Sequence, residues 1–207
     1  MDVLVVDHPL VQGRLTALRD RHTEPGAFRA ALHELTTMLV YEATRRLPVE
    51  RYPIETPVAP TEGVRAAKPP LLVPVLRAGL GMAEAMLQAL PEASVWHLGL
   101  YRDHATLKPV TYYNKLPPKP EMDVGIVLDP MLATGGSAIA AIDILRKAGT
   151  PRVVFAGLIA APEGVAALQA AHPEVPIFLA ALDSHLNEVG YIVPGLGDAG
   201  DRQFATD

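Results

Sequence analysis

The amino-acid sequence predicts an α/β protein with a parallel sheet that helices cover on both faces. From Leu71 onward, short apolar segments of strand length alternate with segments of helical periodicity, which is typical of a parallel sheet built from strand–helix–strand units. The chain has 207 residues, 49% of them hydrophobic, which suits one domain with an arm or insertion, or two small domains. We expect a single domain that spans residues 1–207.

Two helices are expected ahead of the sheet. The segment Leu10–Arg21 has apolar residues at helical spacing. A longer helix follows, with a predicted hydroxyl cap at Thr23 and a proline in its first turn at Pro25. Arg45 and Arg46 suit the end of this helix, where the dipole favours positive charge. Its apolar face comprises Phe28, Ala31, Leu32, Leu35, Met38, Leu39 and Ala43.

Residues 48–70 change character, because prolines recur among residues that favour strands. Prolines interrupt helices, and the strand formers here are Val49, Tyr52, Ile54, Thr56 and Val58. We expect an extended arm or hairpin outside the main sheet. Such an arm either crosses onto a second subunit or packs on its own chain, and the sequence leaves both readings open.

The sheet and its helices follow in order. The expected strands are 71–76, 94–100, 124–128, 152–159 and 177–182, and the expected helices are 80–90, 137–148 and 163–171. Ligands of such sheets bind beyond the carboxyl ends of the strands. The loops after Leu76, Leu100 and Leu128 are therefore the first places to look for a site.

The segment Arg102–Asp123 is long, polar and rich in proline, and it contains the pair Tyr112 and Tyr113. A loop of this length inside a compact domain is usually a lid or disordered. A lid over a reactive site excludes water during the reaction. The sequence pattern leaves both readings, a lid and a disordered segment, open at this point.

The composition excludes several classes of protein. There are no cysteines, so thiolate catalysis, cysteine-ligated zinc and disulfides are excluded. The net charge of −5 argues against a partner with a phosphate backbone, so no nucleic acid is expected. No apolar run is long enough to span a membrane, and the first residues lack the basic start of a signal peptide. A cytoplasmic location is expected.

The segment Asp129–Ser137 predicts a phosphate site. An apolar strand ends in Asp129, small and hydroxyl residues follow, and a helix pattern begins near Ser137. Such a loop directs backbone N–H groups and the positive end of the helix dipole at a bound phosphate. The carboxylate would repel a phosphate, so we assign it to sugar hydroxyls. The loop matches neither a Walker motif nor a dinucleotide fingerprint, and an ordinary strand–helix turn is the alternative.

Two arginines follow neighbouring strands. The planar guanidinium of Arg77 suits a pair of phosphate oxygens, and the alternative is a surface arginine beside an acid. Arg102 is a candidate second positive group for a diphosphate. Gly79 and Gly81 are expected to let the backbone approach a ligand.

The C-terminal segment 191–202 is rich in glycine. Its exposed main-chain amides and carbonyls are suited to read a flat heterocycle that itself carries amide groups. The alternative is a flexible tail. Asp183 and Asp201 are interpreted as structural or solvated.

These motifs together resemble the uracil phosphoribosyltransferase family over nearly the full chain. The resemblance is carried by Arg77-Ala-Gly-Leu-Gly81, Tyr101-Arg102, Leu107-x-Pro109, Asp129-Pro-Met-Leu-Ala-Thr-Gly-Gly-Ser137, Ala161-Pro-Glu-Gly164 and the segment Gly190–Asp201. Many members of the wider superfamily have two adjacent acids where this chain has Asp129 and Pro130, and the uracil branch shares the proline. The resemblance implies a type I phosphoribosyltransferase fold with N-terminal helices, a protruding β-arm (48–70), a flexible lid (102–123) and a C-terminal hood (183–207).

The resemblance also implies an activity. The enzyme would transfer the 5-phosphoribosyl group of phosphoribosyl diphosphate to uracil N1, giving UMP and diphosphate in pyrimidine salvage. Mg²⁺ would be the cofactor, held mainly by the diphosphate with Asp198 near it. A homodimer or higher homo-oligomer and activation by GTP, known for some members, are further implications. The alternatives are a phosphoribosyltransferase for another nucleobase and a regulatory RNA-binding protein on the same fold, which the acidic net charge disfavours.

Site residues follow from the same resemblance. Arg77, Arg102 and Asp129 would be the catalytic residues. Main-chain groups of Ile192, Gly197, Asp198 and Ala199 would bind uracil. Phosphoribosyl diphosphate would be bound by Arg77, Arg102, Asp129, Pro130, Met131, Leu132, Ala133, Thr134, Gly135, Gly136, Ser137 and Asp198.

Overall fold

The computed structural model describes residues 3–102, 109–114 and 122–206. Its centre is a mixed, mostly parallel sheet in the strand order β1-β12-β10-β8-β4-β6-β7, with β5 beside β4. All neighbouring pairs run parallel except β6 and β7. The strands are β1 (Val3–Val5), β4 (Leu71–Leu76), β5 (Ser94–Val95), β6 (Leu98–Arg102), β7 (Pro109–Asn114), β8 (Val124–Leu128), β10 (Arg152–Ala156) and β12 (Ile177–Leu179).

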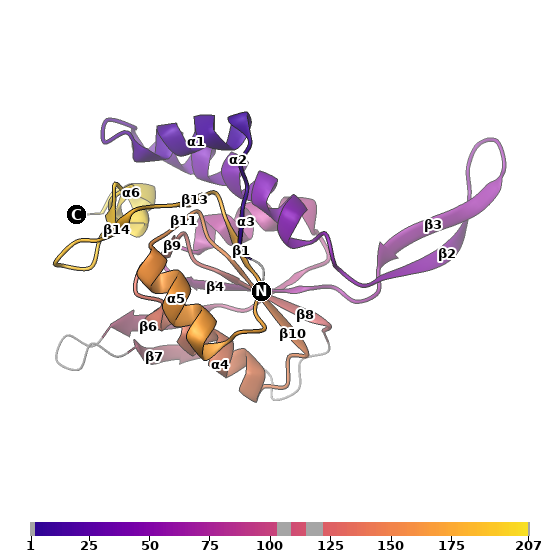
Figure 1. Ribbon diagram of the computed structural model, residues 1–207. Coiled ribbons are helices and arrows are strands. Elements are labelled where there is room, and N and C mark those ends of the chain that lie inside the picture. Colours follow the sequence, from indigo (N-terminus) through magenta and orange to yellow (C-terminus); the bar gives the residue numbers. More distant parts are fainter. Residues whose placement is uncertain (1–2, 103–108, 115–121, 207) are drawn as a thin grey trace.

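Helices cover both faces of this sheet (Figure 1). On one face lie α1 (Pro9–Arg19), α2 (Pro25–Ala43) and α3 (Leu80–Ala89), and on the other lie α4 (Gly136–Lys147) and α5 (Pro162–Ala171). Successive side chains of a strand point to opposite faces, so Leu72 joins the core under the first group of helices while Leu71 and Val73 join the core under α4 and α5. The predicted α/β fold is confirmed.

Three predicted strands are divided in the structure. The strand 94–100 divides into β5 and β6 within the main sheet, and the other two divide between sheets. The expected strand 152–159 ends at Ala156, and β11 (Ile159–Ala160) begins after a turn; likewise 177–182 divides into β12 and β13 (Ala181–Leu182). The second halves form a separate three-stranded parallel sheet with β9 (Met131–Leu132), in the order β13-β11-β9. At both places the chain passes from the main sheet to the smaller sheet, and the continuous apolar sequence gave no sign of this change.

Two strands of the main sheet were missed by the sequence analysis. Val3–Val5 forms the edge strand β1, which pairs in parallel with β12. Pro109–Asn114, inside the expected lid, forms β7 and pairs antiparallel with β6. The other lid residues, 103–108 and 115–121, lie outside the described residues, as do the side chains of residues 100–102 and 109–111.

The ends of the N-terminal helices differ in detail from expectation. Helix α2 begins at Pro25 as predicted, but the hydroxyl cap was wrong, because the Thr23 hydroxyl donates to the Ala17 carbonyl oxygen at 2.6 Å. The helix ends at Ala43, so Arg45 lies beyond its last turn and binds the Glu42 carboxylate instead.

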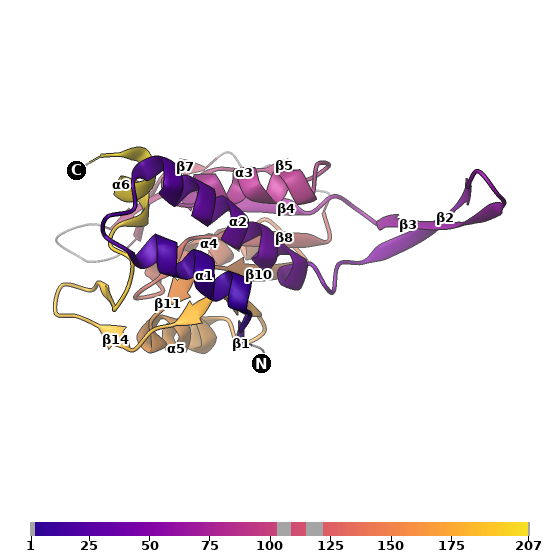
Figure 2. The same cartoon turned by 90° about the horizontal axis from the view of Figure 1, so that it is seen from above.

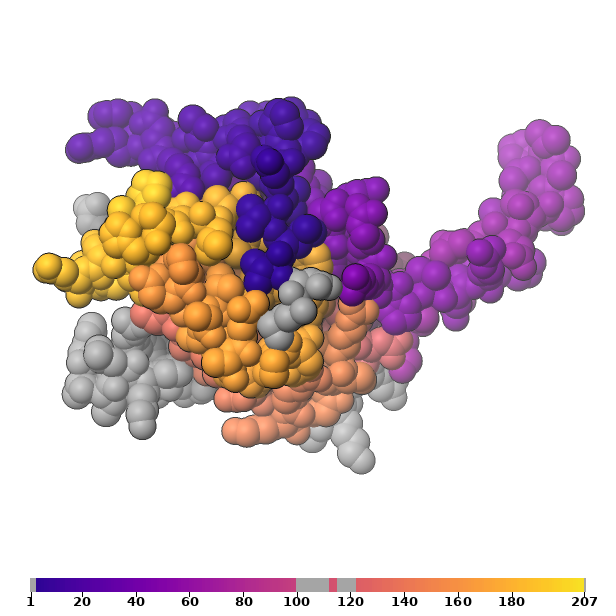
Figure 3. All heavy atoms as spheres, viewed as in Figure 1, coloured from indigo at the N-terminus to yellow at the C-terminus, as the bar shows by residue number. Residues whose placement is uncertain are grey.

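The predicted arm is confirmed as an antiparallel hairpin of β2 (Val49–Glu55) and β3 (Pro60–Ala66). It forms a sheet of its own and projects away from the body of the molecule, as the ribbon views show (Figures 1 and 2). The space-filling view shows the same projection (Figure 3). No helix among the described residues is long and apolar enough to cross a membrane.

The C-terminal hood follows β13. It contains the short antiparallel pair β14 (His185–Leu186) and β15 (Ile192–Val193), and it ends in α6 (Ala199–Phe204). Figure 3 shows these last residues against the N-terminal helices. The next section describes how the hood is held there.

Candidate active site

The site lies beyond the carboxyl ends of β4, β8 and β6. Strand β4 lies between β8 and β6 and is parallel to both, so Arg77, Asp129 and Arg102 all follow or end strands at one edge of the sheet. The structure thus brings together the strand ends from which the three predicted loops begin. The side chain of Arg102, the last residue of β6, lies outside what the structure describes.

The loop from Asp129 to α4 contains a short strand and a glycine turn. Met131 and Leu132 form β9, and Gly135 precedes the helix with φ of 82°, a conformation that favours glycine. Within the described part of the chain, no side chain caps α4 and no acid occupies its first turn. The N–H groups at this helix start are therefore suited to bind a phosphate.

Neighbouring loops fix the backbone of this segment. The Pro130 carbonyl oxygen accepts hydrogen bonds from the N–H groups of Leu158 and Ile159, both at 3.0 Å, and the Leu132 carbonyl oxygen accepts from Ala161 at 3.0 Å. These bonds leave the loop little freedom to rearrange, which is the preorganisation that an anion site needs.

The structure explains a motif whose role was not evident from the sequence. Gly164, in the first turn of α5, lies so close to the loop that a Cβ would stand 2.4 Å from the Ala133 carbonyl oxygen. Only glycine lets α5 approach the loop this closely. The segment Ala161–Gly164 therefore packs against the loop of the candidate phosphate site and holds it in place.

The carboxyl group of Asp129 is largely buried, and burial raises its pKa to about 7. The nearby negative charge of Asp198 raises the pKa further, while a hydrogen bond from the Met131 N–H, at 3.3 Å, lowers it. The structure thus brings Asp129 and Asp198 near enough for their charges to interact. A cation or a hydrogen-bond donor from a ligand would favour the ionised form.

Arg77 is paired with an acid, as the alternative reading of the sequence expected. Its Nη2 donates to Asp201 Oδ1 at 2.9 Å and its Nη1 donates to Thr206 Oγ1 at 3.3 Å. The Arg77 side chain is 55% exposed, so the guanidinium still faces solvent at the edge of the sheet. The peptide bond between Leu76 and Arg77 is cis.

The glycines after β4 have a packing role that the sequence analysis did not predict. A Cβ on Gly79 would lie 2.4 Å from the Leu128 carbonyl oxygen, and a Cβ on Gly81 would lie 2.0 Å from Gln203 Oε1. Both glycines therefore allow the chain to pack closely against itself, and the expected approach of a ligand to this backbone stays a prediction.

A buried ion pair anchors the start of the hood. Asp183, only 8% exposed, accepts hydrogen bonds from both terminal nitrogens of Arg19 and from the Gly195 N–H, the last at 2.9 Å. Arg19 also donates to the Gly195 carbonyl oxygen at 2.8 Å. The structural role expected of Asp183 is confirmed.

Arg202 anchors the other end of the hood, a role that the sequence analysis missed. Its guanidinium donates to the carbonyl oxygens of Leu18 and Leu196 and, at 2.6 Å, to that of Asp20. It also lies over the Phe28 ring, 4.5 Å from the centroid. The glycine-rich segment is thus tied to α1 and α2, which argues against the flexible-tail reading.

The candidate base-reading residues lie between these two anchors. Gly197 and Asp198 are exposed, whereas Ile192 and Ala199 are buried. Gly195 and Gly197 have φ of 66° and 80°, so their turns favour glycine. Asp198 caps the start of α6, because its Oδ1 accepts the Asp201 N–H at 3.0 Å.

Fold and site together define a class of protein. A parallel sheet covered by helices on both faces, with a glycine-rich strand–loop–helix segment at the carboxyl ends of its strands, is the arrangement to be compared with solved structures. The chain is similar in fold to a hypoxanthine-guanine phosphoribosyltransferase from Bacillus anthracis, with a TM-score of 0.54 and 11% identity over 77% of this chain and 80% of that one. An APRTase from Giardia lamblia is also similar in fold, with a TM-score of 0.52 and 16% identity, covering 75% of this chain and 81% of that one. The fold is the type I phosphoribosyltransferase fold.

Closer relatives identify the family. The family model described as Uracil phosphoribosyltransferase matches residues 5–206. A uracil phosphoribosyltransferase of Roseiflexus castenholzii is 62% identical over 99% of this chain and 98% of its own length. One of Geobacillus kaustophilus is 55% identical, again over 99% of this chain and 98% of its own length. A solved structure of an Aquifex aeolicus protein has a TM-score of 0.92 and 37% identity, covering 98% of both chains. The chain belongs to the uracil phosphoribosyltransferase family.

Proposed function

We propose that this protein transfers the 5-phosphoribosyl group of phosphoribosyl diphosphate to uracil N1, giving UMP and diphosphate. Membership of the uracil phosphoribosyltransferase family supports the activity. The observation that carries the residue roles is the meeting of the Asp129–Ser137 loop, Arg77 and the hood at one edge of the sheet.

The loop would bind the ribose-5-phosphate. Its support comes from the uncapped start of α4 among the described residues and from the fixed backbone of the loop. Asp129 would hold the ribose hydroxyls, because a carboxylate accepts hydrogen bonds in pairs. Arg77 and Arg102 would hold the diphosphate, the group that carries the developing negative charge as it leaves.

The hood would read the base. We assign uracil recognition to main-chain groups of Ile192 and of residues 197–199, as the sequence resemblance implied. Exposure of Gly197 and Asp198, and the anchoring of the segment by Arg19 and Arg202, support this assignment. A base read by fixed main-chain groups is held without the entropy cost of ordering side chains.

The chemistry is displacement at the anomeric carbon. The bond from that carbon to the diphosphate oxygen breaks, a bond to uracil N1 forms, and the N1 proton is lost. The transition state resembles an oxocarbenium ion, as in glycoside hydrolysis. No protein nucleophile is required, so the residues act by positioning the two substrates and by neutralising charge.

Mg²⁺ is the cofactor that we propose, bound together with the diphosphate. Among the described residues, no group of three or more His, Asp or Glu side chains is placed to hold a metal by itself. Mg²⁺ commonly binds through one or two carboxylates together with substrate phosphates, and Asp129 and Asp198 are two acids whose charges interact. When bound, the ion would neutralise charge on the leaving diphosphate.

We also assign residues 102–123 as a lid. Its assignment rests on the length of the segment and on the position of β6, which runs parallel to β4 and therefore ends at the same edge of the sheet as Arg77. Hydrolysis of the activated sugar is the side reaction that closure would prevent.

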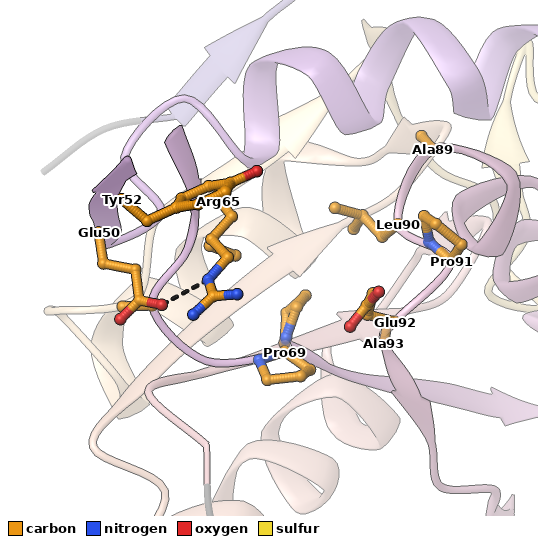
Figure 4. Close-up of a pocket in the computed structure, with 12 residues that line it drawn as sticks. Glu50, Tyr52, Arg65, Pro69, Ala89, Leu90, Pro91, Glu92 and Ala93 are labelled. Atoms are coloured by element: carbon orange, nitrogen blue, oxygen red, sulfur yellow. Dashed lines mark hydrogen bonds and ion pairs between the residues drawn. The ribbon is translucent and has the colours of Figure 1, made fainter. Parts of the chain in front are cut away.

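A homodimer formed through the arm is the assembly that we propose. An isolated two-stranded hairpin is only marginally stable in water, so the arm needs a surface to pack against. In the single chain, the apolar residues Val49 and Val64 of the arm are 59% and 54% exposed. A hollow of about 610 Å³ lies where the arm joins the body (Figure 4). Arg65 and Tyr52 line it from the arm and Glu92 lines it from the loop after α3. A second copy of the chain would cover these surfaces.

The test is an assay of UMP formation from uracil, phosphoribosyl diphosphate and Mg²⁺. We expect turnover with uracil and little with cytosine, adenine or hypoxanthine. Turnover with another base in preference to uracil would contradict the base assignment. Adding GTP to the same assay measures the activation that the resemblance implied, as a rise in rate.

A further inference from the structure

Arg77, the arginine assigned to the diphosphate, is in contact with the carboxylate of Asp201. A carboxylate beside the residue assigned to the diphosphate would by itself repel that anion. Asp201 nevertheless lies there, 2.9 Å from Arg77 Nη2, and is fixed by further bonds. Thr206 Oγ1 donates to the same oxygen at 2.8 Å, and the Thr206 N–H donates to the Asp201 carbonyl oxygen at 3.2 Å.

Helix α6 places this carboxylate. Gln203, only 2% exposed, donates from Nε2 to the Ala78 carbonyl oxygen at 3.1 Å, directly after Arg77. Gly200 also lies close to Ala78, since a Cβ at Gly200 would stand 3.9 Å from that of Ala78. The helix is thus attached to the loop after β4 at several points, so the position of Asp201 relative to Arg77 is set by buried packing.

The same helix begins in the candidate base site. Asp198 is its first flanking residue and accepts the N–H of Asp201 itself. Helix α6 therefore joins the segment assigned to uracil with the arginine assigned to diphosphate.

We propose that Asp201 is a positioning residue that holds the Arg77 guanidinium in the orientation needed to receive the diphosphate. This proposal rests on the proposed function of Arg77. A guanidinium carries more N–H groups than the contacts to Asp201 and Thr206 use, so its remaining edge can bind phosphate oxygens while the carboxylate holds the other edge. Fixing a flexible arginine in advance lowers the entropy cost of binding the anion.

The experiment compares Asp201→Ala, Asp201→Asn and Glu188→Gln with the wild type. The alanine removes both charge and acceptor, whereas asparagine retains an oxygen that accepts from Arg77. Glu188 is an exposed acid of the hood, so its change controls for the loss of one negative charge. The probes are calorimetry with diphosphate and Mg²⁺, and the steady-state constants for phosphoribosyl diphosphate.

Asp201→Ala should weaken diphosphate binding and lower kcat/KM for phosphoribosyl diphosphate by about fivefold, the scale of a partly exposed charged contact. Asp201→Asn should recover part of the loss, and Glu188→Gln should match the wild type. If both Asp201 variants bind diphosphate more tightly than the wild type, the carboxylate competes with the anion and the proposal is overturned.

A double-mutant cycle separates positioning from a general effect on folding. In an Arg77→Ala background, Asp201→Ala should have no further effect on diphosphate binding, because Asp201 acts through Arg77. A further loss of the same size in that background would overturn the proposal. A wild-type protein that binds diphosphate but forms no UMP would instead count against the proposed function alone.

Discussion

The guanidinium of Arg19, at the end of the first helix, binds both carboxylate oxygens of Asp183, at 2.8 and 2.5 Å, although the two residues lie 164 positions apart in the sequence. This pair attaches the hood to α1. Because the Asp183 carboxylate also accepts the Gly195 N–H, it fixes the turn that leads into the candidate base-reading residues.

Replacing Asp183 with alanine should therefore affect both stability and base binding. Removing one partner of a largely buried pair leaves the other charge unpaired, which costs about 3 kcal/mol of unfolding free energy. We expect a higher KM for uracil as well. Urea denaturation and steady-state kinetics measure the two effects. Arg51→Ala, which breaks an exposed pair with Glu62, should change the unfolding free energy by less than about 1 kcal/mol.

Gly164→Ala should weaken binding of phosphoribosyl diphosphate. The new Cβ would press against the Ala133 carbonyl oxygen at 2.4 Å, so either α5 or the loop must move. We expect at least a tenfold rise in the dissociation constant, about 1.4 kcal/mol, with the helical content unchanged. Gly13→Ala is the matched control. Within the described part of the chain, a Cβ at Gly13 meets no atom within 4 Å, and it should stabilise α1 by about 0.5–1 kcal/mol. Equal affinities for all three proteins would contradict the supporting role of Gly164.

The raised pKa of Asp129 predicts a pH dependence of stability. The pKa is 3.8 without the protein environment and about 7 in the fold, so the folded state binds the proton more tightly than the unfolded state. The stability that the protonated Asp129 contributes to the folded state is fully present below about pH 4 and is lost as the pH rises through about 7.

Asp129→Asn should consequently be more stable than the wild type at pH 8, by up to roughly 4 kcal/mol, and the difference should narrow as the pH falls toward 4. It should also weaken binding of phosphoribosyl diphosphate, because asparagine has one acceptor oxygen where the carboxylate has two, and its NH2 group cannot accept from a sugar hydroxyl. Thermal melts across this pH range and calorimetry test both statements. A stability difference that does not vary with pH would exclude a shifted Asp129 as its cause.

Arg102→Ala should lower kcat by about 100-fold while changing the KM for uracil little. Its proposed partner is the leaving diphosphate, whose charge grows in the transition state. Single-turnover measurements of UMP formation give the rate of the chemical step. An Arg102→Ala enzyme with wild-type kcat would remove this residue from the catalytic set.

Val64→Glu should weaken the proposed dimer. Val64 lies on the arm and is 54% exposed, so a charge there is harmless to the single chain but unfavourable in an interface. Sedimentation velocity should show a shift toward monomer at low micromolar concentration. Val189→Glu, at a hood position that is 75% exposed, provides the control and should sediment as the wild type does.

Local sequence was sufficient to locate the strand–loop–helix segment around Asp129 and the hairpin of residues 48–70. Both depend on neighbouring residues: an apolar strand, small residues before a helix, and prolines among strand formers. The divided strands at 152–160 and 177–182 were not predicted, because apolar residues are equally suited to either sheet. Strand β7 was hidden by the prolines around it, and β1 was overlooked because it is short.

The sequence by itself determined the chemistry that is available at the candidate site and the family to which the motifs belong, since those features lie in short contiguous segments. Only the tertiary structure decided which groups meet: Asp201 with Arg77, Asp183 with Arg19, Gly164 with the loop, and Asp198 near Asp129. The physical reason is that periodicity and propensity report interactions between neighbours in sequence. Contacts between distant residues arise only when packing of the core brings their segments together.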